Sequence, residues 1–180
     1  MGRETLEPQE LAEVEEPERR ALQTRVAVSV AVLAMLTSIA VLQSEHSATA
    51  SLLQKNDAVL VQSQASDQWA LRQAKSIKLH VQELAPGGGK DADADRQRAD
   101  IAAAEELARE FEARRDEANR ASGEEFERHH RFSIATSLLQ ISIVLETVAV
   151  VVDRRSVWWG GLMVGTAGAL ALANGFLGLV

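Results

Sequence analysis

The segment VAVSVAVLAMLTSIAVL, residues 26–42, carries no charge and is 17 residues long. That length is at the short end of the roughly 17–25 residues that cross a bilayer as a helix. Two more apolar segments follow: residues 132–152, interrupted by Gln140 and Glu146, and residues 157–180, which are uncharged. None of the three contains proline. The sequence therefore predicts an all-α integral membrane protein with three transmembrane helices.

The composition supports separate membrane and water compartments. Hydrophobic residues make up 46% of the 180 residues and aromatic residues only 4%, and the charges crowd into residues 1–25 and 43–131. The net charge of −7 argues against binding nucleic acid through its phosphates. The absence of cysteine excludes disulfides, thiolate zinc sites and thiol catalysis.

The acidic, proline-containing residues 1–25 are predicted to form a flexible N-terminal tail, either disordered or a short helical docking segment. This leader does not resemble the positively charged start of a signal peptide, so we expect residues 26–42 to remain as an uncleaved anchor. Arginines flank the first span and fill the turn before the third, which favours a cytoplasmic N-terminus and a periplasmic connection between spans one and two: Arg19, Arg20, Arg25, Arg154 and Arg155. The expected location is the bacterial inner membrane, with several passes.

Residues 43–131 show two heptad stripes, as in an antiparallel coiled-coil hairpin. Leu42 and Phe132 are equally distant in sequence from Gly87, inside a predicted turn at residues 85–94 that contains one proline and three glycines. The first stripe comprises Leu53, Asn56, Leu60, Ser63, Asp67, Ala70, Ala74, Ile77, Val81 and Leu84. The second comprises Ile101, Ala104, Ala108, Phe111, Arg115, Ala118, Ser122, Glu125, His129 and Phe132.

The predicted seam is polar in its lower half, where Asn56, Ser63 and Asp67 would face Arg115. A polar seam is either loosely packed and accessible to water, or part of a polar network to which other protomers or a partner contribute side chains. Polar seam positions commonly set register and partner number, so a network completed in an oligomer is favoured.

Polar and small residues in the spans predict helix packing. Gln140 is expected level with Thr37, and Asn174 level with Thr136, where hydrogen bonds could join the helices. The third span carries a small-residue stripe that lets helix backbones approach closely: Gly161, Gly165, Ala169 and Ala173.

Glu146 is the exception within the spans, with Ser29 as its only nearby candidate partner. A charged group is costly there. It is interpreted as protonated and bonded to another helix; the alternative is a wet cavity or oligomer axis, where it would serve ions or protons.

The histidines are weak metal candidates. His46 should lie near His129 and His130 in the predicted hairpin, but solvated histidines are the more common case. No catalytic triad, phosphate loop or H-E-x-x-H motif is present, so no enzyme activity and no cofactor are predicted.

The chain resembles an uncharacterised bacterial domain-of-unknown-function family of small three-span membrane proteins. The resemblance rests on residues 56–84 and 138–180, with Trp69, Gln73, Lys75 and Lys78 in the first stretch and the closing N-G-F-L at 174–177. It implies the three-span topology and no known activity, and it implies a small residue where Glu146 stands.

Together these features predict a self-associating membrane scaffold, tether or accessory subunit of a larger complex that presents its hairpin to protein partners. The alternatives are a small oligomeric channel or transporter component with Glu146 in a polar site, and a pH sensor built on His46, His129 and His130.

Overall fold

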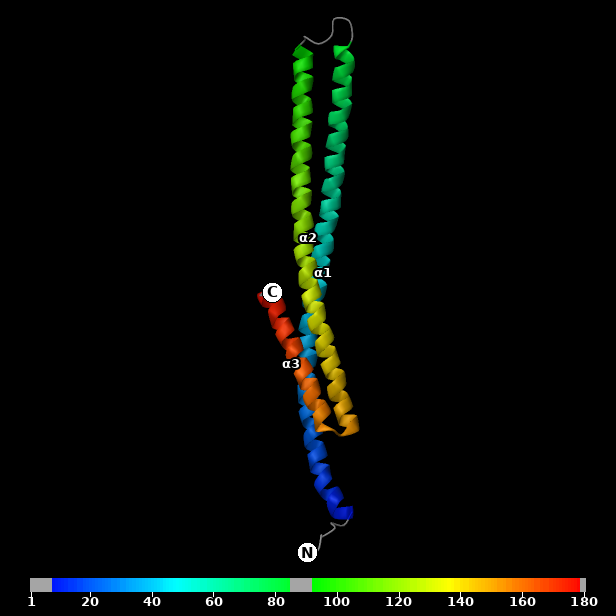
Figure 1. The fold of residues 1–180 in the computed structure, drawn as a ribbon, viewed down its shortest axis with the longest axis vertical. Coiled ribbons are helices and arrows are strands. Elements are labelled where there is room, and N and C mark those ends of the chain that lie inside the picture. The colour runs from blue at the N-terminus through cyan, green and yellow to red at the C-terminus, as the bar shows by residue number, and fades with distance from the viewer. Residues whose placement is uncertain (1–7, 85–91, 179–180) are drawn as a thin grey trace. The chain divides into compact units, whose positions relative to one another are not determined.

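The computed structural model describes residues 8–84 and 92–178. Within these ranges the chain forms three helices and no strand: α1 (Pro8–Glu83), α2 (Ala92–Val152) and α3 (Arg155–Leu177) (Figure 1). The prediction of an all-α fold is confirmed. The predicted turn at residues 85–94 lies mostly outside the described residues, as do residues 1–7 of the predicted tail.

Each described helix is long and apolar enough to cross a membrane, by length and composition. The three apolar segments of the sequence fall on three different helices, and α2 ends at Val152, where the second segment ends. These properties suggest a membrane protein.

From residue 8 on, the N-terminal region follows the helical alternative for the tail. α1 begins at Pro8, so residues 8–25 are helical, and Leu22 is buried with 5% of its surface exposed. Glutamate, leucine, alanine and arginine dominate this region and are among the strongest helix formers. Pro8 is tolerated in the first helical turn, whereas Pro17 lies inside the helix, where proline removes one backbone hydrogen bond. The acidic composition that indicated flexibility is thus equally compatible with a helix.

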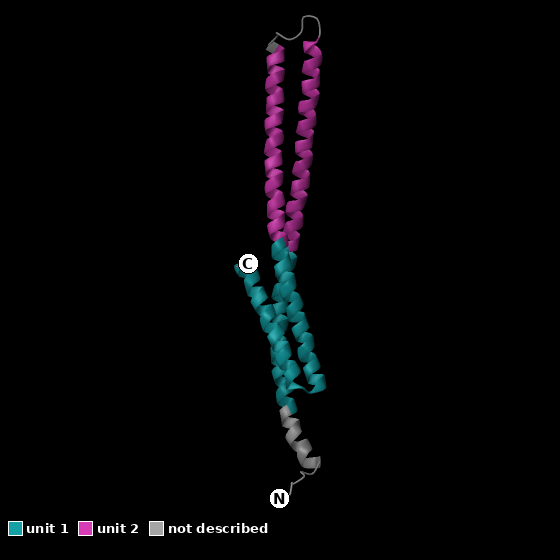
Figure 2. Cartoon of the chain, in the orientation of Figure 1, with its two compact units in different colours: residues 1–47, 127–180 teal, residues 48–126 magenta. Residues whose placement is uncertain are grey.

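The chain divides into two compact units, which Figure 2 colours separately. Unit 1 contains residues 1–47 and 127–180, and unit 2 contains residues 48–126. α1 and α2 contribute to both units, whereas α3 belongs to unit 1.

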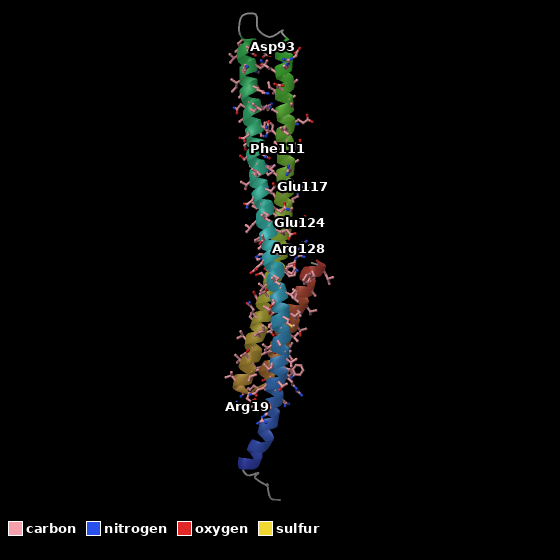
Figure 3. The ribbon with its side chains drawn as sticks, turned by 180° about the vertical axis from the view of Figure 1, so that it is seen from behind. Arg19, Asp93, Phe111, Glu117, Glu124 and Arg128 are labelled. Carbon is pink, nitrogen blue, oxygen red and sulfur yellow. The ribbon has the colours of Figure 1, made fainter. Side chains whose placement is uncertain are left out.

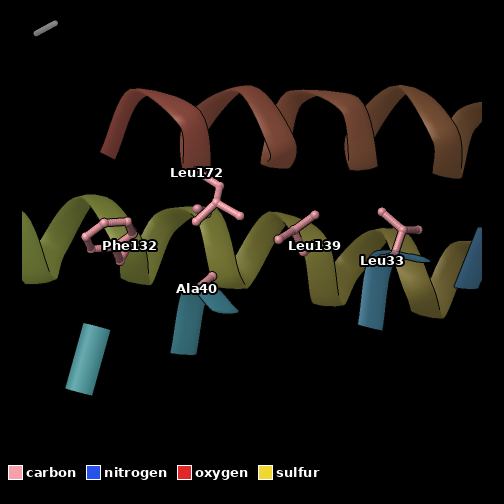
Figure 4. Packing of buried hydrophobic residues seen from close by; sticks show 6 residues of the cluster. Leu33, Ala40, Phe132, Leu139 and Leu172 are labelled. Atoms are coloured by element: carbon pink, nitrogen blue, oxygen red, sulfur yellow. The ribbon is translucent and has the colours of Figure 1, made fainter. Parts of the chain in front are cut away.

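The core of unit 1 is built from all three helices (Figure 4). It comprises Leu33 and Ala40 of α1, Phe132, Ala135 and Leu139 of α2, and Leu172 of α3. The Phe132 ring meets Phe176 of α3 edge to face, with ring centroids 5.2 Å apart. Leucine, alanine and phenylalanine side chains thus hold the three apolar segments together.

Glycines form most of the buried face of α3. Its buried residues are Gly161, Gly165, Gly168, Leu172 and Gly175. The predicted stripe was right for Gly161 and Gly165, but Ala169 is only half-buried and Ala173 is exposed. Residues four apart advance about 400° around a helix, so a strict four-residue stripe drifts off one face, whereas alternating four- and three-residue steps stay on it.

Unit 2 is a pair of antiparallel helical segments from α1 and α2. Residue numbers of contacting pairs rise along one helix and fall along the other: Ser51–Ser122, Lys55–Asn119, Trp69–Glu112, Arg72–Glu105, Lys75–Asp100 and Glu83–Arg98. The buried side chains between them are mostly small: Ser51, Ala58, Val61, Ala65 and Leu79 of α1, and Ala94, Ala104, Ala108, Ala118 and Ser122 of α2.

The face of α1 that packs in unit 2 is not the predicted one. Every residue of the predicted α1 stripe is exposed, including the polar Asn56, Ser63 and Asp67. The buried stripe is displaced by two positions, to residues 51, 58, 65 and 79. The prediction weighted the larger apolar side chains, but alanine and serine bring two helix backbones closer together. On α2 the predicted stripe faces α1, with Ala104, Ala108, Ala118 and Ser122 buried and Arg115 half-buried.

Candidate functional site

A buried carboxylate in unit 1 is the most unusual polar group of the described structure. Glu146 of α2 has no exposed surface, and Ser29 of α1 donates a hydrogen bond to its Oε2. The indole Nε1 of Trp158, on α3, lies 3.4 Å from the same serine Oγ and donates toward it. One side chain from each helix therefore meets at this point, and the predicted pairing of Glu146 with Ser29 is present.

The third helix packs tightly against Glu146 because α3 has no side chain there. A Cβ placed on Gly161 would lie 2.7 Å from Glu146 Cγ and 3.2 Å from its backbone nitrogen. One turn earlier on α2, Ser142 Oγ donates a hydrogen bond of 2.6 Å to the carbonyl oxygen of Gly161. The close contact excludes other atoms from this side of the carboxylate.

The second carboxylate oxygen, Oε1, is buried and has no hydrogen-bond partner in the described part of the chain. A buried polar atom without a partner is rare in proteins and requires an explanation. A proton, an ion or another chain could satisfy it. The described residues hold no cluster of three histidine, aspartate or glutamate side chains able to bind a metal ion.

The other predicted polar residues of the spans do not join the helices. Thr37 donates 2.7 Å to the carbonyl of Leu33 in its own helix, and Gln140 is exposed. Asn174 is half-buried and contributes its backbone carbonyl to the cap at Gly178, at 2.8 Å. Among the described residues, the predicted hydrogen bonds between helices at these positions are therefore not formed. The threonine hydroxyl donates to a backbone carbonyl of its own helix instead.

The histidines belong to no group of three possible metal ligands among the described residues. His129 Nδ1 lies 2.9 Å from both the hydroxyl and the carbonyl oxygen of Ser44 on α1, which fixes its ring at the helix contact. His46 and His130 are exposed. The geometry gives no support to a shared metal site or a histidine sensor.

In unit 2, Trp69 carries part of the contact between the helices. Its Nε1 donates 2.9 Å to Glu112 of α2, and the guanidinium of Arg72 stacks 5.5 Å from its ring centre. Arg72 also bonds Glu105 at 2.9 Å. This chain of contacts locks the register of the two helices.

Among the other family-motif residues, Lys75 pairs with Asp100 of α2 at 3.0 Å, whereas Gln73 and Lys78 are exposed. Asp100 and the other acidic partners were not predicted, because alternating charges on α2 are typical of a solvated helix face. The antiparallel register could have identified them, since it places those carboxylates opposite a tryptophan, an arginine and a lysine.

A shallow groove of about 750 Å³ runs along the outside of α2. Figure 3 labels Glu117 and Glu124 on this helix. The groove is lined by Glu110, Ala113, Arg114, Glu117, Arg120, Ala121 and Glu124. All belong to one helix, so this is an open surface and not an enclosed binding site.

Within the described ranges, the fold and the site define an all-helical protein with three membrane-competent helices and one buried carboxylate. The chain belongs to the family described as domain of unknown function DUF4337, whose model matches residues 22–178. No curated protein and no solved structure matches the chain.

Proposed function

We propose that this protein is a non-enzymatic membrane scaffold or accessory subunit that self-associates and presents residues 48–126, as a helical hairpin, to protein partners. The observation that carries this proposal is an exposed apolar face on α1 in unit 2. An isolated helix pair in water rarely exposes a contiguous apolar face, and large exposed apolar patches usually mark interaction sites.

This face is the heptad stripe of α1 that α2 does not cover, here called the outer stripe: residues 53, 56, 60, 63, 67, 70, 74, 77, 81 and 84. Its large apolar side chains are well exposed, from 58% for Leu60 and Ile77 to 64% for Leu53 and 85% for Leu84. Heptad spacing is the pattern by which one helix packs along another. The outer stripe therefore suits a partner helix.

Unit 1 is proposed to lie in the bilayer. Apolar side chains point away from its core on every helix, including Met35 at 69%, Val144 at 61% and Met163 at 75% exposed, as in helices that face lipid. We place the protein in the bacterial inner membrane, with the N-terminus in the cytoplasm and the hairpin in the periplasm. The arginines around the spans support this orientation.

Mass measurement of the purified protein in lipid nanodiscs tests the scaffold proposal. The expected result is an oligomer, or a stoichiometric complex with a co-purifying protein. Replacing Leu60 and Ile77 with glutamine should abolish it while preserving helicity, and Ala103→Gln, an exposed change on α2, should not. A wild-type monomer without any companion would contradict the proposal.

A second candidate function is a small channel or transporter component. The buried Oε1 of Glu146, which lacks a partner within the described ranges, favours it. In this case Glu146→Gln, which keeps the shape of the side chain, should abolish a proton or cation flux into proteoliposomes while the oligomer remains intact. Equal flux in both proteins, or none in either, would exclude a channel role for this residue.

A further inference from the structure

α1 carries two heptad stripes in unit 2, and only one of them is occupied. The occupied stripe contains Ser51, Ala58, Ala65 and Leu79 and packs on α2. The outer stripe is displaced from it by two residues, which is about 200° around the helix. α1 is thus built to contact one helix on each side.

The order of residues in the outer stripe fits an antiparallel copy of itself. If Leu60 of one copy meets Ile77 of the other, the same register places Leu53 opposite Leu84 and Asp67 opposite Ala70. Every layer then contains at least one apolar side chain. A parallel pair in register would instead place Asp67 against Asp67, where two like charges repel each other.

The charged residues beside the outer stripe also favour an antiparallel pair. Asp57 and Lys78 form no ion pair among the described residues, whereas Arg72 and Lys75 of the same helix are already paired with α2. In the antiparallel register Asp57 of each copy lies beside Lys78 of the other, on the edge of the contact. In a parallel pair the two side chains would be about 32 Å apart along the axis, at a rise of about 1.5 Å per residue.

We propose that the outer stripe of α1 is the docking surface for a second copy of this chain, with the two α1 segments antiparallel and Leu60 of one copy packed on Ile77 of the other. This inference rests on the proposed function and names its partner. The arrangement is two-fold symmetric, so each copy presents the same surface.

Cysteine crosslinking tests the pairing directly, because the chain has no cysteine of its own. Leu60→Cys and Ile77→Cys are reconstituted together into one population of phosphatidylethanolamine–phosphatidylglycerol vesicles, and each is also reconstituted alone; all vesicles are then oxidised. The expected result is a disulfide-linked dimer in the vesicles that hold both variants and little in those that hold either variant alone. Ala113→Cys, an exposed position on α2, is the matched control and should not link to Leu60→Cys.

Three results overturn the proposal. A dimer from Leu60→Cys alone shows a parallel pair, linkage to Ala113→Cys shows that α2 is the partner surface, and the absence of any dimer shows that the stripe does not bind a second copy. In each case the nanodisc mass measurement on the unmodified protein still decides separately whether the protein self-associates.

Charge exchange provides an independent readout. Asp57→Lys creates two like-charged contacts in the symmetric pair and should weaken dimerisation about tenfold, since exposed ion pairs contribute modestly and a tenfold change needs about 1.4 kcal/mol. Adding Lys78→Asp to the same chain restores opposite charges and should recover the original affinity. Failure of the double variant to recover affinity would refute the Asp57–Lys78 contact.

Discussion

The contact between Gly161 and Glu146 makes a quantitative prediction. In Gly161→Ala, the new methyl group would lie 2.7 Å from Glu146 Cγ, 3.2 Å from its backbone nitrogen and 3.3 Å from the carbonyl oxygen of Ser142. Two of these atoms belong to the α2 backbone and cannot rotate away. Overpacking of this kind typically lowers the free energy of unfolding by about 1–3 kcal/mol.

Gly160→Ala is a matched control on the same helix, because a Cβ there meets nothing within 4 Å. Both variants gain the same helix propensity of about 1 kcal/mol, so their difference isolates the packing term. Denaturation by sodium dodecyl sulfate, followed by the fluorescence of Trp158 and Trp159, measures this difference. We expect Gly161→Ala to be about 1–3 kcal/mol less stable than Gly160→Ala; equal stabilities would refute the packing of α3 against Glu146.

Two further predictions concern unit 2. Ser51 Oγ donates 2.9 Å to the carbonyl of Ser122, and Ser122 Oγ donates 3.0 Å to the carbonyl of Ser51; each alanine variant should therefore lose about 1 kcal/mol in thermal unfolding followed by circular dichroism. Ser66→Ala removes only two bonds to Gln62 within its own helix and should change stability by less than about 0.5 kcal/mol. Similar losses at all three positions would contradict the reciprocal bonds. Trp69→Phe removes the hydrogen bond to Glu112 and should lose about 1 kcal/mol in the same assay. The loss should be absent in a Glu112→Ala background, where no side-chain acceptor remains for the indole N–H.

Hydrophobic segregation was sufficient to predict the fold class. Apolar runs of suitable length predicted three membrane-competent helices, and all three are present. The pairing of Glu146 with Ser29 followed from counting residues along two apolar segments that run in opposite directions. Such features depend on helical rise alone, which varies little between proteins.

Rotation about the helix axis was harder to predict. Both faces of α1 carry a heptad pattern, one of small residues such as Ala58 and Ala65 and one of larger residues such as Leu60 and Ile77. Apolar size favoured the second, yet the contact with α2 uses the first. The heptad pattern alone does not show which of two stripes on one helix packs against a given neighbour. Small residues stabilise a contact by letting the helix backbones approach closely, whereas large residues stabilise it by the apolar area they bury.

Topology is the central claim, and labelling of single cysteines with a membrane-impermeant maleimide on spheroplasts tests it most directly. Ala113→Cys in unit 2 is exposed and lies off the outer stripe, and Val144→Cys and Met163→Cys are exposed on the outer faces of α2 and α3. The proposed topology predicts rapid labelling at residue 113 and none at residues 144 and 163 until the membrane is dissolved. Equal labelling at all three positions in intact spheroplasts would contradict it.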